Sequence, residues 1–255
     1  MISFTEAQIV AWLSPVLWPF LRILAVFSAA PVLSSRAFPL RARIGLAFLV
    51  ALAAQAALSG QPVISINSPQ AMGTVVQQVG IGLAIGFTVR LVFAAVELAG
   101  EVIGFQMGLN FASFFDPSLN SQSSAVARFF GQMASLLFVV LNGHIMVLMA
   151  TVKSFEAFPV DQNFLEALKT MKLQQLGADL FASGLWMALP MVGMLMFVNL
   201  ALGIVSRVAP QMNIYSVGFP ITLSVGLVGI AVTLPLMDQP FMALMERSID
   251  IFLGK

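Results

Sequence analysis

The sequence predicts an all-α, membrane-associated protein. Hydrophobic residues make up 59% of its 255 residues, charged residues make up only 9%, and the mean hydropathy is +0.96. These values leave little room for a soluble globular protein. The apolar residues also gather into long segments, separated by turn-forming clusters, as in chains whose helices cross or enter a bilayer.

Six apolar segments are expected to form helices, at roughly residues 9–33, 44–58, 75–108, 129–152, 180–205 and 217–236. A helix needs about 20 apolar residues to cross the bilayer core. Segment 44–58 is shorter than that, whereas segment 75–108 is much too long for a single crossing. Such unequal lengths fit helices that pack on other protein better than they fit uniform crossings.

The connections between these segments complete the expected organisation. Residues 1–6 lack the basic start of a signal peptide, so the first segment is expected to be retained. The charged stretch 153–179 places Phe164, Leu168 and Met171 on one helical face, which predicts an amphipathic surface helix. Residues 241–255 predict a partly exposed terminal helix. Because no repeat or linker interrupts the chain, residues 1–255 are expected to form one domain with no appended soluble domain.

Charge does not give these segments a consistent orientation. Arg36, Arg41 and Arg43 would place the first connection in the cytoplasm, and the uncharged residues 59–74 would then lie outside. The lysines of stretch 153–179 would also lie outside if every segment crossed. A pattern of plain crossings is therefore disfavoured.

Residue sets for catalysis and metal binding are missing from the sequence. The chain has no cysteine and a single histidine, His144, which excludes disulfides, thiolate sites and histidine clusters. No nucleophile–base pair and no phosphate-binding glycine loop is recognisable. The 12 basic and 11 acidic residues nearly cancel, so no basic field exists to attract nucleic acid. We expect no enzymatic activity, cofactor, metal or nucleic-acid partner.

The third segment contains both charges and regularly spaced glycines. Arg90, Glu97 and Glu101 fall near one helix face. They either neutralise one another in a packed interior or line an ion or protein pathway, and the sequence favours neither reading. A polytopic secondary carrier for a small ion or solute, with a midplane site at these residues, is the alternative function. The four-residue glycine spacing is typical of close helix packing in membranes, at Gly82, Gly86, Gly100 and Gly104.

The end of this segment combines glycines with large, soft side chains. Residues 104–112 read Gly-Phe-Gln-Met-Gly-Leu-Asn-Phe-Ala and run on to Asp116 and Pro117. A loop of this content is suited to filling a hole reversibly. Spacing alone favours the simpler alternative, an ordinary turn whose aromatic side chains tuck into the core.

Two further polar groups interrupt apolar segments. Asn142 and His144 are expected to form interhelical hydrogen bonds more readily than a proton relay. Residues 207–213 place Arg207, Pro210 and Gln211 between two strongly apolar stretches and end at Asn213. Backbone freed by a proline at membrane depth needs partners in protein or beside a water-filled path. This turn is therefore expected to face protein or a channel rather than lipid.

Taken together, these motifs resemble the FliR/SctT family of type III secretion export-gate proteins. The matching residues, in the family's order and across nearly the whole chain, are Arg22 with Pro31, Gly82 with Gly86 and Arg90, residues 105–112 with Asp116 and Pro117, residues 142–144, Asn199 with Leu202 and Gly203, and residues 207–213. The Gln-Met-Gly-Leu and Pro-Gln-Met-Asn pair is the specific part of the match, and overall similarity favours the flagellar branch over the injectisome branch.

The resemblance implies a non-enzymatic component of a flagellar export gate in the bacterial cytoplasmic membrane, within the flagellar basal body. One such chain would join several copies of FliP and FliQ, with FlhB and FlhA as neighbours, and its helices would form kinked hairpins packed within a helical hetero-oligomer. Unfolded rod, hook and filament subunits would pass through the gate. The loop expected to close the channel comprises Phe105, Gln106, Met107, Gly108, Leu109, Asn110, Phe111, Ala112, Asp116 and Pro117. The polar residues expected to face the channel or a neighbouring subunit are Arg90, Glu97, Glu101, Asn142, His144, Arg207, Gln211 and Asn213.

Overall fold

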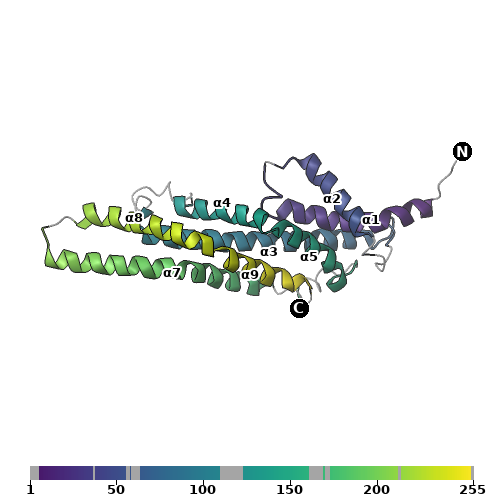
Figure 1. Cartoon of the computed structure of the whole chain (residues 1–255). Coiled ribbons are helices and arrows are strands. Elements are labelled where there is room, and N and C mark those ends of the chain that lie inside the picture. The colour runs from purple at the N-terminus through teal and green to yellow at the C-terminus, as the bar shows by residue number, and fades with distance from the viewer. Residues whose placement is uncertain are drawn as a thin grey trace. The chain divides into compact units, whose positions relative to one another are not determined.

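The computed structural model describes residues 6–36, 38–55, 58, 64–109, 123–160, 169, 173–211 and 214–253 (Figure 1). Within them the chain is helical, and no residue is in a β-strand, which confirms the all-α prediction. The α-helices are α1 (Glu6–Ala29), α2 (Leu40–Ala54), α3 (Ala71–Gln106), α4 (Ala125–Val140), α5 (Gly143–Ala157), α7 (Leu173–Val208), α8 (Ile214–Thr233) and α9 (Asp238–Asp250). Two short 3₁₀ helices, η3 (Leu234–Leu236) and η4 (Ile251–Leu253), flank α9.

The apolar segments and the helices agree except in the fourth segment. The third segment, expected to be too long for one crossing, is a single uninterrupted helix of 36 residues. Segment 129–152 is divided between α4 and α5 at Leu141 and Asn142. Asn142 has φ of +58°, in the left-handed region, and asparagine tolerates that conformation better than other non-glycine residues. A right-handed helix cannot continue through such a residue, so α4 ends and α5 begins there.

The two expected surface helices have different outcomes. The middle of the stretch 153–179, including Phe164, Leu168 and Met171, lies outside the described residues; α5 ends at Ala157 and α7 begins at Leu173. The terminal helix is present as α9. It exposes Glu246 and Arg247 and buries Phe241 and Met245, as a partly exposed amphipathic helix should.

The chain divides into two compact units, and each has its own core. Unit 1 contains residues 1–91, 142–177 and 245–255, and unit 2 contains residues 92–141 and 178–244, so α3 contributes to both. In unit 1, the buried side chains of Trp18, Phe155 and Val160 form a cluster. In unit 2, the Phe93 ring packs edge-on against Phe138 and Phe241, at centroid distances of 5.6 and 6.1 Å. Such edge-to-face pairs stabilise an aromatic core beyond their burial.

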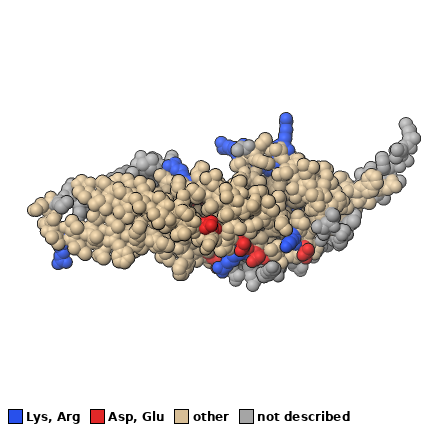
Figure 2. Space-filling view, viewed as in Figure 1, with Lys and Arg blue, Asp and Glu red and all other residues tan. Residues whose placement is uncertain are grey.

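Four described helices are long and apolar enough to cross a membrane: Val10–Ala29, Ala71–Gln106, Leu176–Val208 and Ser216–Leu236. Helices α4 and α5 meet the same test when they are taken together. The most apolar stretch of α3 is 61% buried within the chain, but that of α7 is only 17% buried. On the face drawn in Figure 2, charged atoms are sparse among the uncharged ones. A large apolar surface is therefore left for lipid or other protein to cover.

Candidate functional site: buried polar groups and the end of helix α3

Unit 1 is organised around a fully buried arginine, Arg22, in the middle of α1. Its Nε donates a hydrogen bond to Gln78 Oε1 of α3 at 2.9 Å, and Nη1 donates to Ser154 Oγ of α5 at 3.0 Å. Nη2 donates to the backbone oxygen of Phe158 at 2.7 Å. The rigid guanidinium thereby joins α1 to α3 and to the end of α5, which are far apart in the sequence. A lysine ammonium could not make these bonds with the same geometry.

The charge of Arg22 is stabilised without a carboxylate among its described partners. Phe158 directly follows α5, and Ser154 lies in the last turn of that helix. The negative end of the α5 dipole therefore points at the guanidinium, and its unpaired carbonyl groups include one that accepts from Arg22. The guanidinium carbon also lies 3.5 Å from the centre of the Phe155 ring, a cation–π contact. These interactions allow a cation to remain buried in an apolar unit.

A polar relay extends from this cluster along α3. Gln78 donates from Nε2 to Gln77 Oε1 at 2.8 Å, and Gln77 donates to the backbone oxygen of Pro159 at 3.2 Å. Nearer the start of α1, Ser14 and Trp18 both donate to the backbone oxygen of Ile64, at 3.0 and 3.3 Å. These bonds fix the segments before α3 and after α5 onto α1.

The sequence-based site predictions did not include Arg22, which appeared only among the residues of the family resemblance. A signal was present, because Arg22 is a lone cation in the middle of the apolar segment 9–33. What the sequence lacks is the identity of its partners. Gln78 and Ser154 are 56 and 132 positions away.

Gly82 and Gly86 lie where α3 crosses α1. A Cβ atom on Gly82 would overlap the backbone oxygen of Arg22 and lie 2.7 Å from Ala25 Cβ. A Cβ on Gly86 would lie 2.5 Å from Ala29 Cβ. The two helices therefore approach to a distance that only glycine permits, and this close approach brings Gln78 within reach of Arg22.

Gly100 and Gly104 have the same role between α3 and α4 in unit 2. A Cβ on Gly100 would lie 2.8 Å from Ala127 Cα, and one on Gly104 would lie 3.0 Å from Ser124 Oγ. Glycines 131, 184 and 226, which the spacing did not single out, also lie against other helices. Their partners cannot be read from the sequence, because each faces a segment outside its own helix.

The two glutamates of α3 are used in packing against α4. Glu101 Oε2 accepts a hydrogen bond from the backbone nitrogen of Ser124 at 3.1 Å, and Ser124 Oγ in turn accepts from the nitrogen of Ala127. A carboxylate at the start of a helix is favoured by the helix dipole. Glu97 extends along Gly131, where a Cβ would lie 2.7 Å from Glu97 Oε1. The third charged side chain of α3, that of Arg90, is exposed.

Helix α3 ends in a turn that is held against α8. Met107 is fully buried, and Gly108 adopts φ of +79°, which glycine accommodates without strain. Met107 lies directly over Gly226 of α8, where an added Cβ would be 2.6 Å from both Met107 Cγ and Met107 Cε. Thr222 Oγ1 faces the Met107 backbone oxygen at 3.4 Å.

Only part of the expected closure loop is described. Phe105 is 55% exposed at the end of α3, and Gln106, Gly108 and Leu109 are half-buried. Residues Asn110, Phe111, Ala112, Asp116 and Pro117 lie outside the described residues. The simpler alternative, a turn whose aromatic side chains tuck into the core, is not met at Phe105, which is exposed; the buried side chain of this turn is Met107.

The remaining predicted polar residues are dispersed. Asn142 is exposed at the break before α5, and His144 is half-buried in the first turn of that helix. Arg207 is exposed in the last turn of α7, and Gln211 is exposed just beyond it. Asn213 lies outside the described residues. The structure therefore brings Glu97 and Glu101 to α4 but does not gather the predicted polar set into one site.

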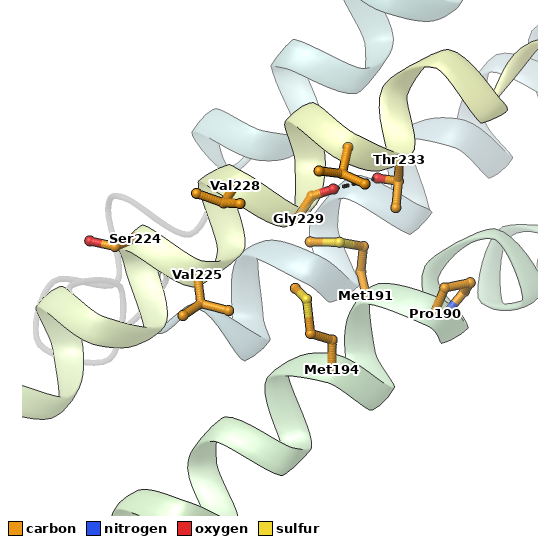
Figure 3. Close-up of a pocket in the computed structure, with 9 residues that line it drawn as sticks. Pro190, Met191, Met194, Ser224, Val225, Val228, Gly229 and Thr233 are labelled. Atoms are coloured by element: carbon orange, nitrogen blue, oxygen red, sulfur yellow. Dashed lines mark hydrogen bonds between the residues drawn. The ribbon is translucent and has the colours of Figure 1, made fainter.

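A cavity of about 360 Å³ lies between α7 and α8 (Figure 3). Met191 and Met194 extend from α7 toward Gly229 of α8, and Thr233 donates a hydrogen bond to the Gly229 backbone oxygen at 2.9 Å. The lining is almost entirely apolar and holds no titratable group. No cluster of three or more metal-binding side chains occurs among the described residues. The residues that line this cavity therefore offer apolar packing contacts.

The fold and these contacts define an all-α membrane protein whose buried polar groups join helices to one another. The chain belongs to the bacterial export proteins, family 1, whose model matches residues 13–248. It is 41% identical over 241 residues to the flagellar biosynthetic protein FliR of Escherichia coli K12, covering 94% of this chain and 92% of that protein. The FliR of Pectobacterium carotovorum is 41% identical over 243 residues, with the same coverage. The FliR of Bacillus subtilis is 32% identical over 212 residues, 82% of each chain.

Proposed function

We propose that this chain is a structural, non-enzymatic component of the channel through which the flagellar export apparatus moves proteins across the bacterial cytoplasmic membrane. The relatives that carry the proposal are flagellar biosynthetic proteins, and their alignments cover nearly the whole chain. The family assignment lends no support to the alternative of a small-solute carrier. The bond between Glu101 and the start of α4 also ties one of the carrier's proposed midplane carboxylates to a structural contact.

The observation that supports a multi-subunit channel is the mismatch between helix length and bilayer thickness. At about 1.5 Å per residue, the 36 residues of α3 and the 36 residues of α7 each extend about 54 Å. The hydrocarbon core is only about 30 Å thick. Helix α7 is apolar along most of its length, and its most apolar stretch is 17% buried within the chain. The excess apolar length needs a protein surface to cover it, and neighbouring subunits would supply one.

The partners that fit this requirement are other apolar, helical subunits of the gate. By family resemblance these are FliP and FliQ in the core, with FlhB and FlhA as neighbours in the basal body. The substrates would be unfolded rod, hook and filament subunits. The single domain of residues 1–255 would then consist of two units that are completed by contacts with these partners.

The segment from Phe105 to Pro117 is the proposed closure element of the channel. Two contacts of described residues support this role, one near the start of the segment and one seven residues beyond its end. Met107 is seated over Gly226 on one side, and Ser124 is bound to Glu101 on the other. Such fixed points would confine a closing segment to one place while subunits pass.

The assembly proposal is tested by the native mass of the complex that contains this chain. The chain would carry an affinity tag and be extracted from membranes in a mild detergent. We expect a hetero-oligomer with one copy of this chain, and we expect its deletion to abolish secretion of hook and filament subunits. A monomer or homodimer, with secretion intact in the deletion strain, would refute the proposal.

The closure element has a separate test. Removal of residues 110–112, which leaves Met107 in place, should raise the permeability of the cytoplasmic membrane to small ions without loss of the complex. Removal of residues 65–67, which form a connection in unit 1, is the matched control. Unchanged permeability with an intact complex would contradict the closure role and leave the assembly role standing.

A further inference from the structure

A second cavity, distinct from the one between α7 and α8, lies within unit 1. It has a volume of about 430 Å³ and lies between the end of α2 and the second half of α5. Val50 and Ala53 of α2 form one wall, and Met149 and Val152 of α5 form the other. Its size falls in the range of about 300–1,000 Å³ that is usual for pockets that bind small molecules.

The groove is open to the surroundings of the protein and continues into an apolar surface. Met149 is 56% exposed, and Ala53 is also exposed. Next to the groove, α2 presents Leu49 and Leu52 outward, at 62% and 41% exposure. Helix α2 has 15 residues, too few to cross the bilayer core alone. The groove therefore suits a flexible apolar chain that enters from the side.

Two charged side chains, Lys153 and Glu156, line the same groove near the end of α5. They are three residues apart, so they lie on one face of the helix. Both are exposed, and neither forms a hydrogen bond or ion pair within the described part of the chain. The opposite side of α5 is occupied by the Arg22 contacts through Ser154 and Phe155. An apolar groove that carries at one end a cation and an anion without partners among the described residues matches a ligand that has an apolar chain and a zwitterionic head.

We propose that this groove binds the lipid phosphatidylethanolamine. An acyl chain would lie between α2 and α5, the phosphate would accept from the Lys153 ammonium, and the head-group ammonium would donate to the Glu156 carboxylate. Both contacts are charge-assisted hydrogen bonds, which are stronger than neutral ones. Phosphatidylglycerol has no ammonium group and would leave the Glu156 carboxylate without a cation, whereas phosphatidylcholine has no N–H to donate. The groove therefore selects the ethanolamine head.

Native mass spectrometry can test this proposal on the full chain with the subunits that co-purify with it. The complex would be delipidated and supplied with dioleoyl phosphatidylethanolamine, phosphatidylglycerol or phosphatidylcholine at equal concentration. We expect retention of one ethanolamine lipid per chain, with about tenfold preference over phosphatidylcholine, as one lost charge-assisted hydrogen bond predicts. Glu156→Gln should remove the preference for the ethanolamine lipid, and Lys153→Gln should lower the retention of all three lipids. Glu246→Gln, an exposed glutamate of α9, is the control and should change nothing.

A steric variant separates this groove from other lipid contacts. Ala53→Phe fills the groove from an exposed position and should abolish retention, whereas Ala42→Phe, exposed near the start of α2, should not. Equal retention by wild type and Ala53→Phe would overturn the proposal. Because the chain has no cysteine, Met149→Cys gives a single labelling site in this chain. Labelling should rise on delipidation; a site that stays shielded would mean that a protein subunit covers the groove, which also overturns the proposal.

Discussion

The Arg22 guanidinium lies over the Phe155 ring, with 3.5 Å between the guanidinium carbon and the ring centre. Both side chains are fully buried, and they come from helices α1 and α5. The ring covers one face of the planar guanidinium. The N–H groups at the edge of the guanidinium donate hydrogen bonds to α3 and α5. This pair therefore fixes the packing of unit 1, and its geometry leads to the first two predictions.

Replacement of Arg22 by lysine should destabilise unit 1 although the charge is kept. A lysine ammonium cannot reach the acceptors on Gln78, Ser154 and Phe158 together, and a buried charge that loses its partners costs about 3 kcal/mol or more. Detergent-to-SDS unfolding followed by circular dichroism measures the loss. Arg41→Lys, at an exposed position of α2, is the control. Equal unfolding midpoints for Arg22→Lys and wild type would contradict the role given to this arginine.

Ser154→Ala should cost less than the arginine replacement, at about 1–2 kcal/mol. It removes one interhelical hydrogen bond, and such bonds are worth only that much in membrane proteins. Ser183→Ala is a matched control, because the hydroxyl of this half-buried serine donates to the Asp179 backbone oxygen of its own helix. The same unfolding measurement should give a change within about 0.5 kcal/mol for that control. The prediction fails if the two serine variants behave alike.

Gly82→Ala should separate α1 from α3 and lower stability by about 1–3 kcal/mol, the usual cost of overpacking. The new methyl group would meet the backbone oxygen of Arg22, which cannot move aside as a flexible side chain could. Gly45→Ala places the same methyl group on α2, where nothing lies within 4 Å. That control should be neutral or stabilising by up to about 1 kcal/mol, because alanine is the better helix former. Thermal unfolding of the two purified variants in detergent distinguishes them.

Met107 and Gly226 should be energetically coupled. Gly226→Ala alone forces Met107 from its place, since the methyl group would lie 2.6 Å from Met107 Cγ, near the root of that side chain. Met107→Ala alone leaves a cavity. In the double variant the two changes compensate in part, so a double-mutant cycle should give a coupling of about 0.5–3 kcal/mol. Additive effects would show that the two residues do not depend on each other.

Arg207→Ala should leave the fold of the isolated chain intact and weaken assembly. Arg207 is exposed at the end of α7, so its removal should change stability by no more than about 0.5 kcal/mol. In a complex another subunit would bind the Arg207 cation, so the replacement would remove an intersubunit contact. The yield of the co-purified complex, compared with that of Arg36→Ala at another exposed position, measures the effect. Wild-type yield would argue against an intersubunit role.

Helix positions were largely predictable from the sequence, because apolar length is a property of a continuous stretch. Segment 75–108 matches α3 closely, and segment 217–236 matches α8 with the 3₁₀ turn that follows. The break at Asn142 was not predicted. It depends on one residue adopting a left-handed conformation inside an apolar run, and composition carries no sign of that choice.

The candidate site was less predictable, because its contacts join residues that are distant in the chain. The four-residue spacing identified Gly82 and Gly86 from α3 alone, and the structure places both against α1. It could not identify Gly226, whose importance comes from Met107 on another helix. Charge spacing on α3 likewise showed that Glu97 and Glu101 share a face, but only the structure shows that α4 begins against Glu101.

The sparse internal burial of α7 has a consequence for how much of this protein a cell can accumulate. Without partners, the part of the 36-residue helix α7 that exceeds the roughly 30 Å hydrocarbon core would place apolar residues in water, and we expect membrane quality control to remove chains in that state. The number of surviving copies would then be set by the supply of neighbouring subunits and not by the chain's own synthesis. Overproduction of this chain alone should therefore yield degradation rather than additional channels.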